Sequence, residues 1–218
     1  MDRCGREGRR VMSVVRGDVA ALYVDPRGPY PALVLECYDA LRDARTYSGP
    51  LPIVAHPPCG PWGTMRHMSS GRGEAQDVTC GPFAVDAVRR WGGVLEHPRG
   101  SSLFGHCGLP RPGELPDACG GITFEVCQVD WGHVARKRTW LYMVGIALVD
   151  IPPKPPSREP THWASGWKGR SKGKQGSVVP AEIKVCSAQQ RRRTPAAFAA
   201  WLVELASRAS SRNRRQAG

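Results

Sequence analysis

The sequence contains no apolar run that approaches the roughly 18 residues of a membrane-spanning helix. It has no secretory signal peptide and no Cys-x-x-Cys pair, and its eight cysteines are irregularly spaced. These absences argue against a disulfide framework and against a common zinc-site pattern. We therefore expect a soluble cytoplasmic protein with free thiols, no membrane partner and no metal.

Acidic residues are also scarce. The 218 residues include 31 Lys and Arg against 19 Asp and Glu, which gives a formal net charge of +12 and a pI near 9.8. Such a surplus favours a polyanionic partner, and no amphipathic basic helix dominates the sequence to suggest a membrane surface. Charge therefore predicts a nucleic acid as the partner, and the length suits one domain with a sizeable core.

The pattern of apolar residues predicts an α/β fold with a doubly wound, mostly parallel sheet and an antiparallel edge hairpin. The expected elements are strands over 19–24, 51–55, 93–95, 122–129 and 139–144 and helices over 32–45, 81–91 and 195–205. We divide the chain into a disordered arm (1–10), an α/β domain (11–150), a linker with a basic insert (151–192) and a C-terminal helix with a basic tail (193–218).

The insert combines aromatic and basic residues. Five prolines between 152 and 160 predict a stiff linker. The glycine-rich stretch that follows suits contacts to nucleic-acid backbone and bases, through Trp163, Trp167, Lys168, Arg170, Lys172 and Lys174. A disordered surface loop is the alternative. Arg66 lies in a second glycine-, serine- and arginine-rich segment, 60–80, which we interpret as a mobile loop near the site.

Three short signatures occur in order: Pro57-Pro58-Cys59, Glu96-His97-Pro98 and Arg136-Lys137-Arg138. Each of the first two follows an apolar run that resembles a strand, so Cys59 and Glu96 are expected just past strand ends, where open α/β sheets place their chemistry. Two prolines before Cys59 make its loop stiff. A thiol, a carboxyl group and guanidinium groups would then surround one planar base.

This ordered set resembles the DNA cytosine-C5 methyltransferases. In that family a Pro-Cys loop carries the nucleophile, a Glu-Asn-Val strand end carries the carboxyl group and a Gln-x-Arg-x-Arg segment leads into a strand. Arg193-Thr194-Pro195 is similar to a late Arg-x-Thr-Pro segment. The resemblance implies the class I methyltransferase type of fold, a monomer, and double-stranded DNA with a flipped cytosine as substrate. A compact modifier of this kind suits a bacteriophage acting in its host's cytoplasm.

The resemblance implies a catalytic role for four residues. Cys59 would add to C6 of cytosine, and Glu96 would support N3, because C5 is not nucleophilic until a thiolate has added to C6. Arg138 would stabilise charge on the exocyclic oxygen, with Arg136 supporting the loop or a phosphate. Without catalysis, Cys59 would be an inert thiol at a rigid turn, and Arg136 and Arg138 would be ordinary surface charges.

The N-terminal segment, where the family binds its cofactor, differs from the family pattern. S-adenosylmethionine is the implied cofactor, and Asp25, Gly28 and Tyr30 are the candidate residues that bind it. Two prolines occupy that loop where glycines are expected, and the chain before the Pro-Pro-Cys strand has room for one helix and not for two further strands. The N-terminal half of the sheet should therefore be reduced.

Three functions remain open: methyl transfer to C5, the same covalent chemistry ending in hydroxymethylation or deamination, and DNA binding without catalysis. A zinc site is a further alternative, with His56, Cys59 and His97 among its candidate ligands, although the zinc-deaminase pattern is not met. His56-Pro57-Pro58-Cys59 also faintly echoes the Asp-Pro-Pro-Tyr loop of amino-methyltransferases, without its acid or its aromatic ring.

Overall fold

The computed structural model describes residues 17–64, 66, 77–163 and 184–216. Its helices and strands are β1 (Gly17–Leu22), α1 (Tyr30–Leu33), β2 (Val34–Tyr38), η1 (Ala44–Thr46), β3 (Ile53–Ala55), α2 (Cys80–Trp91), β4 (Gly93–Pro98), α3 (Ser102–His106), β5 (Ile122–Cys127), η3 (Gln128–Trp131), β6 (Arg138–Val144), η4 (Leu148–Asp150), β7 (His162–Trp163), β8 (Lys184–Val185), α4 (Ala188–Arg192) and α5 (Ala196–Gln216). The expected arm over 1–10 lies outside the described residues.

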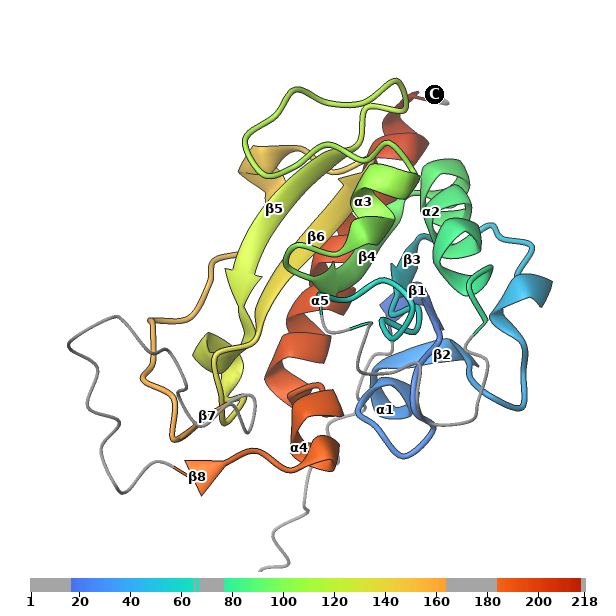
Figure 1. Cartoon of the computed structure of the whole chain (residues 1–218). Coiled ribbons are helices and arrows are strands. Elements are labelled where there is room, and N and C mark those ends of the chain that lie inside the picture. The colour runs from blue at the N-terminus through green and yellow to red at the C-terminus, as the bar shows by residue number, and fades with distance from the viewer. Residues whose placement is uncertain (1–16, 65, 67–76, 164–183, 217–218) are drawn as a thin grey trace, which may run out of the picture.

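Six strands form one mixed sheet in the order β2-β1-β3-β4-β6-β5 (Figure 1). The first four strands of that order run parallel, and β6 is antiparallel to both of its neighbours. The predicted class, an α/β fold with a mostly parallel sheet and an antiparallel hairpin, is therefore confirmed. The arrangement is compatible with a Rossmann-like fold.

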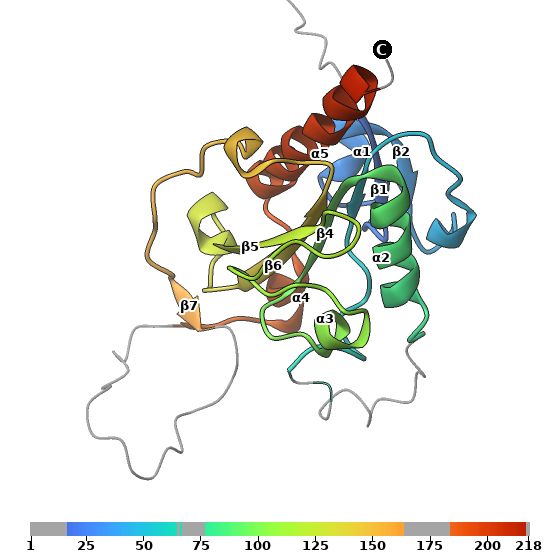
Figure 2. The ribbon, with the colours of Figure 1, turned by 90° about the horizontal axis from the view of Figure 1, so that it is seen from above.

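Helices cover both faces of the sheet, as the view from above shows (Figure 2). Side chains alternate along each strand, so Val54 and Val94 pack against α5, whereas Ile53 and Leu95 pack in the second cluster beside α2 and α3. Burying both faces explains why the central strands are apolar throughout. The core is therefore two apolar layers, one on each side of the sheet.

Gly93 at the start of β4 is required by close packing between neighbouring strands. Its φ is +111°, and an added Cβ would overlap the backbone nitrogen, carbon and oxygen of Ile53 in β3. Only glycine adopts this conformation without strain. The turn from α2 into β4 thereby sets the position of β4 against β3.

The predicted helix over 32–45 is wrong. The helix is the short α1, and the chain then continues as β2, which pairs in parallel with β1 and adds an edge strand that the sequence did not predict. The apolar spacing also fits a half-buried strand, with Val34 and Tyr38 inside and Leu35 outside. Pairing with β1 decided between the two patterns, because tertiary contacts outweigh weak local preference.

Glu96 was expected just past a strand end, and that boundary is also wrong. β4 extends to Pro98 because β6 pairs with it along its whole length, with Leu141 opposite Glu96 and Trp140 opposite His97. An antiparallel neighbour supplied this extension, and the local sequence carries no sign of it. Glu96 therefore sits on a rigid strand.

Candidate active site

Cys59 lies on a tight turn directly after β3. The amide of His56 donates to the carbonyl of Leu22 at 3.0 Å, which ties the end of β3 to β1. The carbonyl of Cys59 then accepts hydrogen bonds from the amides of Trp62 at 3.2 Å and Gly63 at 2.7 Å. The turn closes on its own backbone and leaves Cys59 exposed.

The Cys59 turn is fastened to the segment that follows β4. The carbonyl of Trp62 accepts three hydrogen bonds: from the Ser102 amide at 2.9 Å, the Ser102 hydroxyl at 3.1 Å and the Ser101 hydroxyl at 3.2 Å. Ser101 is buried and also caps α3 through the Leu103 amide. These contacts fix the Cys59 loop relative to the strand that carries Glu96.

Glu96 is buried, and both of its carboxylate oxygens are held by side chains. His56 Nδ1 lies 2.8 Å from Oε2, and Gln128 Nε2 donates to Oε1 at 3.0 Å. Burial by itself would raise the pKa of Glu96, but the charge of Lys137 and the hydrogen bond from His56 outweigh it and hold the pKa at about 2. Glu96 is therefore an oriented carboxylate at neutral pH.

The hydrogen bonds around Glu96 continue in both directions. The Tyr30 hydroxyl lies 2.5 Å from His56 Nε2, and Gln128 Nε2 also lies 3.0 Å from the hydroxyl of Thr139. This series of hydrogen bonds joins α1, the end of β3, β4, η3 and β6. Each side chain in the series restrains the orientation of the next. No pattern in the sequence singled out Gln128, and His56 was predicted only as a candidate zinc ligand and as part of the loop that echoes Asp-Pro-Pro-Tyr.

The thiol of Cys59 and the carboxylate of Glu96 lie close enough to interact. Cys59 as a residue is exposed, but the protein groups around its sulfur displace part of the solvent and raise the pKa of the thiol, and the negative charge of Glu96 raises it further. The charges of Lys137 and Arg192 act in the opposite direction and lower that pKa. The structure therefore couples the Cys59 thiol electrostatically to Glu96, and the charges of Lys137 and Arg192, which the sequence did not single out, act on the same thiol.

Arg136 and Arg138 each have an acidic partner. Arg138 donates from Nε to Glu125 at 2.6 Å, and Arg136 donates to Glu159 at 2.8 Å. Lys137, between them, is the residue whose charge lowers the pKa of both Cys59 and Glu96. Successive side chains in an extended chain point to opposite sides. Lys137 can therefore face the site while Arg136 and Arg138, on either side of it, face away.

The predicted cofactor loop is folded on itself. The Asp25 carbonyl accepts from the Gly28 amide at 2.8 Å, and its carboxylate accepts from the Arg27 amide at 2.9 Å. Pro26 and Pro29 supply no amide donors, and Tyr30 is buried with its hydroxyl on His56. These residues do not form a cradle for S-adenosylmethionine.

The predicted DNA contacts are only partly described. Arg66 is exposed, and its amide donates to Gly63 at 3.0 Å in the Cys59 loop. Trp163 belongs to β7. The amides of Thr161 and His162, which precede it, each donate a hydrogen bond to the carbonyl of Val134 at 2.9 Å. The base of the insert thus adjoins the Arg-Lys-Arg segment. Four further basic residues and one tryptophan lie outside the described residues: Trp167, Lys168, Arg170, Lys172 and Lys174.

His97 is the second buried titratable group on β4. It is fully buried, and neither ring nitrogen has a hydrogen-bond partner within the described part of the chain. Burial lowers its pKa to about 4. Within those same residues no group of three or more His, Cys, Asp or Glu side chains could hold a metal ion, and no helix is long and apolar enough to cross a membrane.

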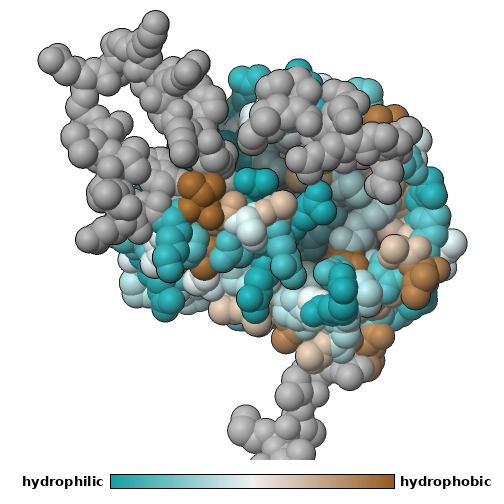
Figure 3. Space-filling view, turned by 60° about the horizontal axis from the view of Figure 1, so that its bottom comes forward, coloured by the Kyte–Doolittle hydropathy of each residue, from teal (hydrophilic) through white to brown (hydrophobic). Residues whose placement is uncertain are grey.

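Fold and site together describe an α/β protein with an exposed thiol on the loop after β3 and a buried carboxylate within the neighbouring strand β4. Figure 3 turns the molecule so that the bottom of Figure 1 comes forward, and the coloured part of the surface in this view is mostly hydrophilic. Comparisons with models of protein families, with curated proteins and with solved structures find no match.

Proposed function

We propose that this protein modifies cytosine in DNA at C5, by covalent addition of the Cys59 thiol to C6 of a base flipped out of the duplex. One observation carries the proposal: the loop after β3 carries a thiol, the neighbouring parallel strand β4 carries a buried carboxylate oriented by His56 and Gln128, and the charge of that carboxylate raises the pKa of the thiol. A flat heterocycle that must be attacked at one atom and supported at another needs two such groups.

The addition step balances within the substrate and Cys59. The sulfur forms a bond to C6, the C5=C6 electron pair moves between C4 and C5, and the C4=N3 pair moves onto N3, which takes up the proton that the thiol loses. Glu96, ionised in the free protein, accepts the hydrogen bond from N3–H and stabilises this product. C5 then has enamine character and reacts with an electrophile.

Lys137 supplies the positive charge in this proposal. Its ammonium lowers the pKa of Cys59 and of Glu96, so it favours the thiolate needed for attack and offsets negative charge that develops on the pyrimidine. The family resemblance gave this electrostatic role to Arg138, which here is paired with Glu125. We assign to Arg138 and Arg136 a supporting role on the DNA side of the loop.

We propose methyl transfer as the first outcome, within a class I methyltransferase type of fold reduced in its N-terminal half. Because Asp25, Gly28 and Tyr30 do not form a recognisable cradle, hydroxymethylation by another one-carbon donor and loss of the amino group remain alternative outcomes of the same adduct. The seven described cysteines are free thiols, which suits a monomer in the cytoplasm, that of the host if the source is a phage.

The addition can be tested without knowing the electrophile. When C6 carries the thiol, solvent can protonate C5, and reversal of the addition then releases the original C5 hydrogen to water. We expect DNA with tritium at cytosine C5 to lose the label in the presence of the protein alone. Cys59→Ser should abolish this release, whereas Cys119→Ser, a change at another exposed cysteine, should leave it unchanged.

Nucleoside mass analysis then identifies the product. A methyl increment that requires S-adenosylmethionine supports methyl transfer, and any other altered cytosine supports one of the alternatives. DNA that is bound yet keeps its label, with Cys59→Ser indistinguishable from the natural protein, would overturn the proposal and favour a binding protein without catalysis.

A further inference from the structure

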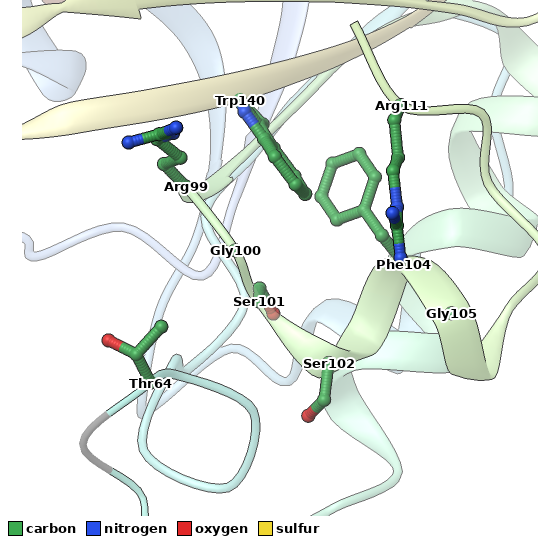
Figure 4. Close-up of a pocket in the computed structure, with 9 residues that line it drawn as sticks. All are labelled: Thr64, Arg99, Gly100, Ser101, Ser102, Phe104, Gly105, Arg111 and Trp140. Carbon is green, nitrogen blue, oxygen red and sulfur yellow. The ribbon is translucent and has the colours of Figure 1, made fainter. Parts of the chain in front are cut away.

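A cavity of about 660 Å³ opens beside the Cys59 loop (Figure 4). Thr64 of that loop lies on one side, the segment after β4 that begins at Arg99 lies on the other, and Trp140 of β6 forms a wall. Trp140 is paired directly across from His97, the residue next to Glu96. Neighbouring residues of a strand point to opposite faces, so the cavity lies with His97 on the α3 face of the sheet, whereas Glu96 points to the other face. The cavity meets the candidate active site at the Cys59 loop, through Thr64.

The charged residues that line the cavity are basic. Its lining contains two arginines, Arg99 and Arg111, and no acidic residue. Arg99 lies 3.4 Å from Glu125, which partly neutralises it. Arg111 is exposed, and its guanidinium makes no hydrogen bond or ion pair with any described residue, although its backbone amide donates to Glu114 at 2.6 Å. Arg111 is thus a cation available to a ligand.

The wall between these two arginines is aromatic. Trp140 is partly exposed, and its indole is fixed by a hydrogen bond from Nε1 to Glu125 at 3.0 Å. Phe104 supports it from beneath, with ring centroids 5.0 Å apart at 71°. Figure 4 shows the two guanidinium groups on either side of this pair. An indole held in place with a face open to a cavity is a stacking surface for a nucleobase.

We propose that this cavity binds the nucleotide that flanks the target cytosine in the same DNA strand, with Arg111 on its phosphate and Trp140 stacked on its base. The proposal rests on the proposed function, because it takes the flipped cytosine to lie at Cys59 and Glu96. A cation and a flat aromatic surface together match one nucleotide unit of a strand. The site would hold the strand in register while the neighbouring base is out of the stack.

The phosphate contact is tested by the salt dependence of binding to a short duplex with one central cytosine. Loss of one phosphate contact reduces the slope of log Kd against log salt by about 0.9. We expect this reduction in Arg111→Ala and an unchanged slope in Arg111→Lys. Arg90→Ala is the matched control, because Arg90 stacks over Trp91 in the last turn of α2, just before β4 begins, whereas the cavity is lined by the segment that follows the end of β4. An Arg111→Ala slope equal to the natural one overturns the proposal.

The base contact is tested with duplexes that lack the base on one side of the cytosine. Trp140→Leu should weaken binding about tenfold, and Trp140→Phe should weaken it much less. The effect of Trp140→Leu should vanish when the missing base is the flanking one. If neither an abasic 5′ nor an abasic 3′ neighbour removes the effect, the stacking proposal fails. Arg111 lies on an exposed loop, so its test stands even if Trp140→Leu does not fold.

The two proposals fail separately. Tritium release that persists while Arg111→Ala leaves the salt slope unchanged would overturn the flanking-nucleotide site and leave the proposed function standing. A slope that depends on Arg111, together with no tritium release by the natural protein, would support the site and overturn the proposed chemistry.

Discussion

His97 gives a quantitative prediction about stability and pH. Burial lowers its pKa in the folded protein to about 4 from an ordinary 6.5, so the unfolded chain binds a proton between these values that the folded protein does not. The resulting stability is present above pH 6.5 and is lost as the pH falls towards 4. One pKa unit corresponds to about 1.4 kcal/mol, which gives a loss of about 2 kcal/mol by pH 5.

Urea unfolding of the natural protein and of His97→Gln, measured at pH 7.5 and at pH 5, isolates this contribution. Other histidines, including the buried His133 whose pKa is also lowered, titrate in both proteins and cancel in the difference. We expect the free-energy difference between the two proteins to change by about 2 kcal/mol across this range. If the unfolding free energies of the natural protein and of His97→Gln fall by the same amount between pH 7.5 and pH 5, the assignment of a buried neutral imidazole at position 97 is refuted.

Other measurements address the strand contact and the charges at the site. Gly93→Ala should cost at least about 2 kcal/mol in urea unfolding because of its positive φ and the overlap with β3, whereas Gly105→Ala, which has nothing within 4 Å, should cost far less; equal effects would contradict the packing. Lys137→Met should raise the pKa of Cys59 and shift the pH profile of tritium release upwards. Glu96→Gln should lower the pKa of Cys59, so that alkylation of Cys59 begins at lower pH. An unchanged alkylation profile would contradict an electrostatic interaction between Glu96 and Cys59.

The hydrogen bonds around Glu96 explain how a buried carboxylate is tolerated. A carboxylate without partners is costly inside a protein, and here His56 and Gln128 hold its two oxygens while Lys137 supplies charge. Tyr30 extends the chain to α1. The N-terminal segment, which resembled a weak cofactor loop in the sequence, thereby contributes a residue to the support of the candidate catalytic carboxylate.

Local patterns were sufficient for several elements. α2 and α5 follow from apolar residues at helical spacing, and the β5–β6 hairpin follows from two β-like runs around the Arg-Lys-Arg segment. The pattern over 32–45 fitted both a helix and a strand. The segment became a strand because β1 has a free edge with which it can pair. This information is not present in any short stretch of the sequence.

The sequence by itself determined the α/β class, the stiff Pro-Pro-Cys loop and the presence of a carboxylate near a strand end, because proline geometry and apolar periodicity act over a few residues. Only the tertiary structure decided that Cys59 and Glu96 interact, that Lys137 is the cation beside both, and that Arg111 and Trp140 share a cavity. Those relations depend on strand order and on the direction of each side chain, and both are fixed by pairing between segments far apart in the chain.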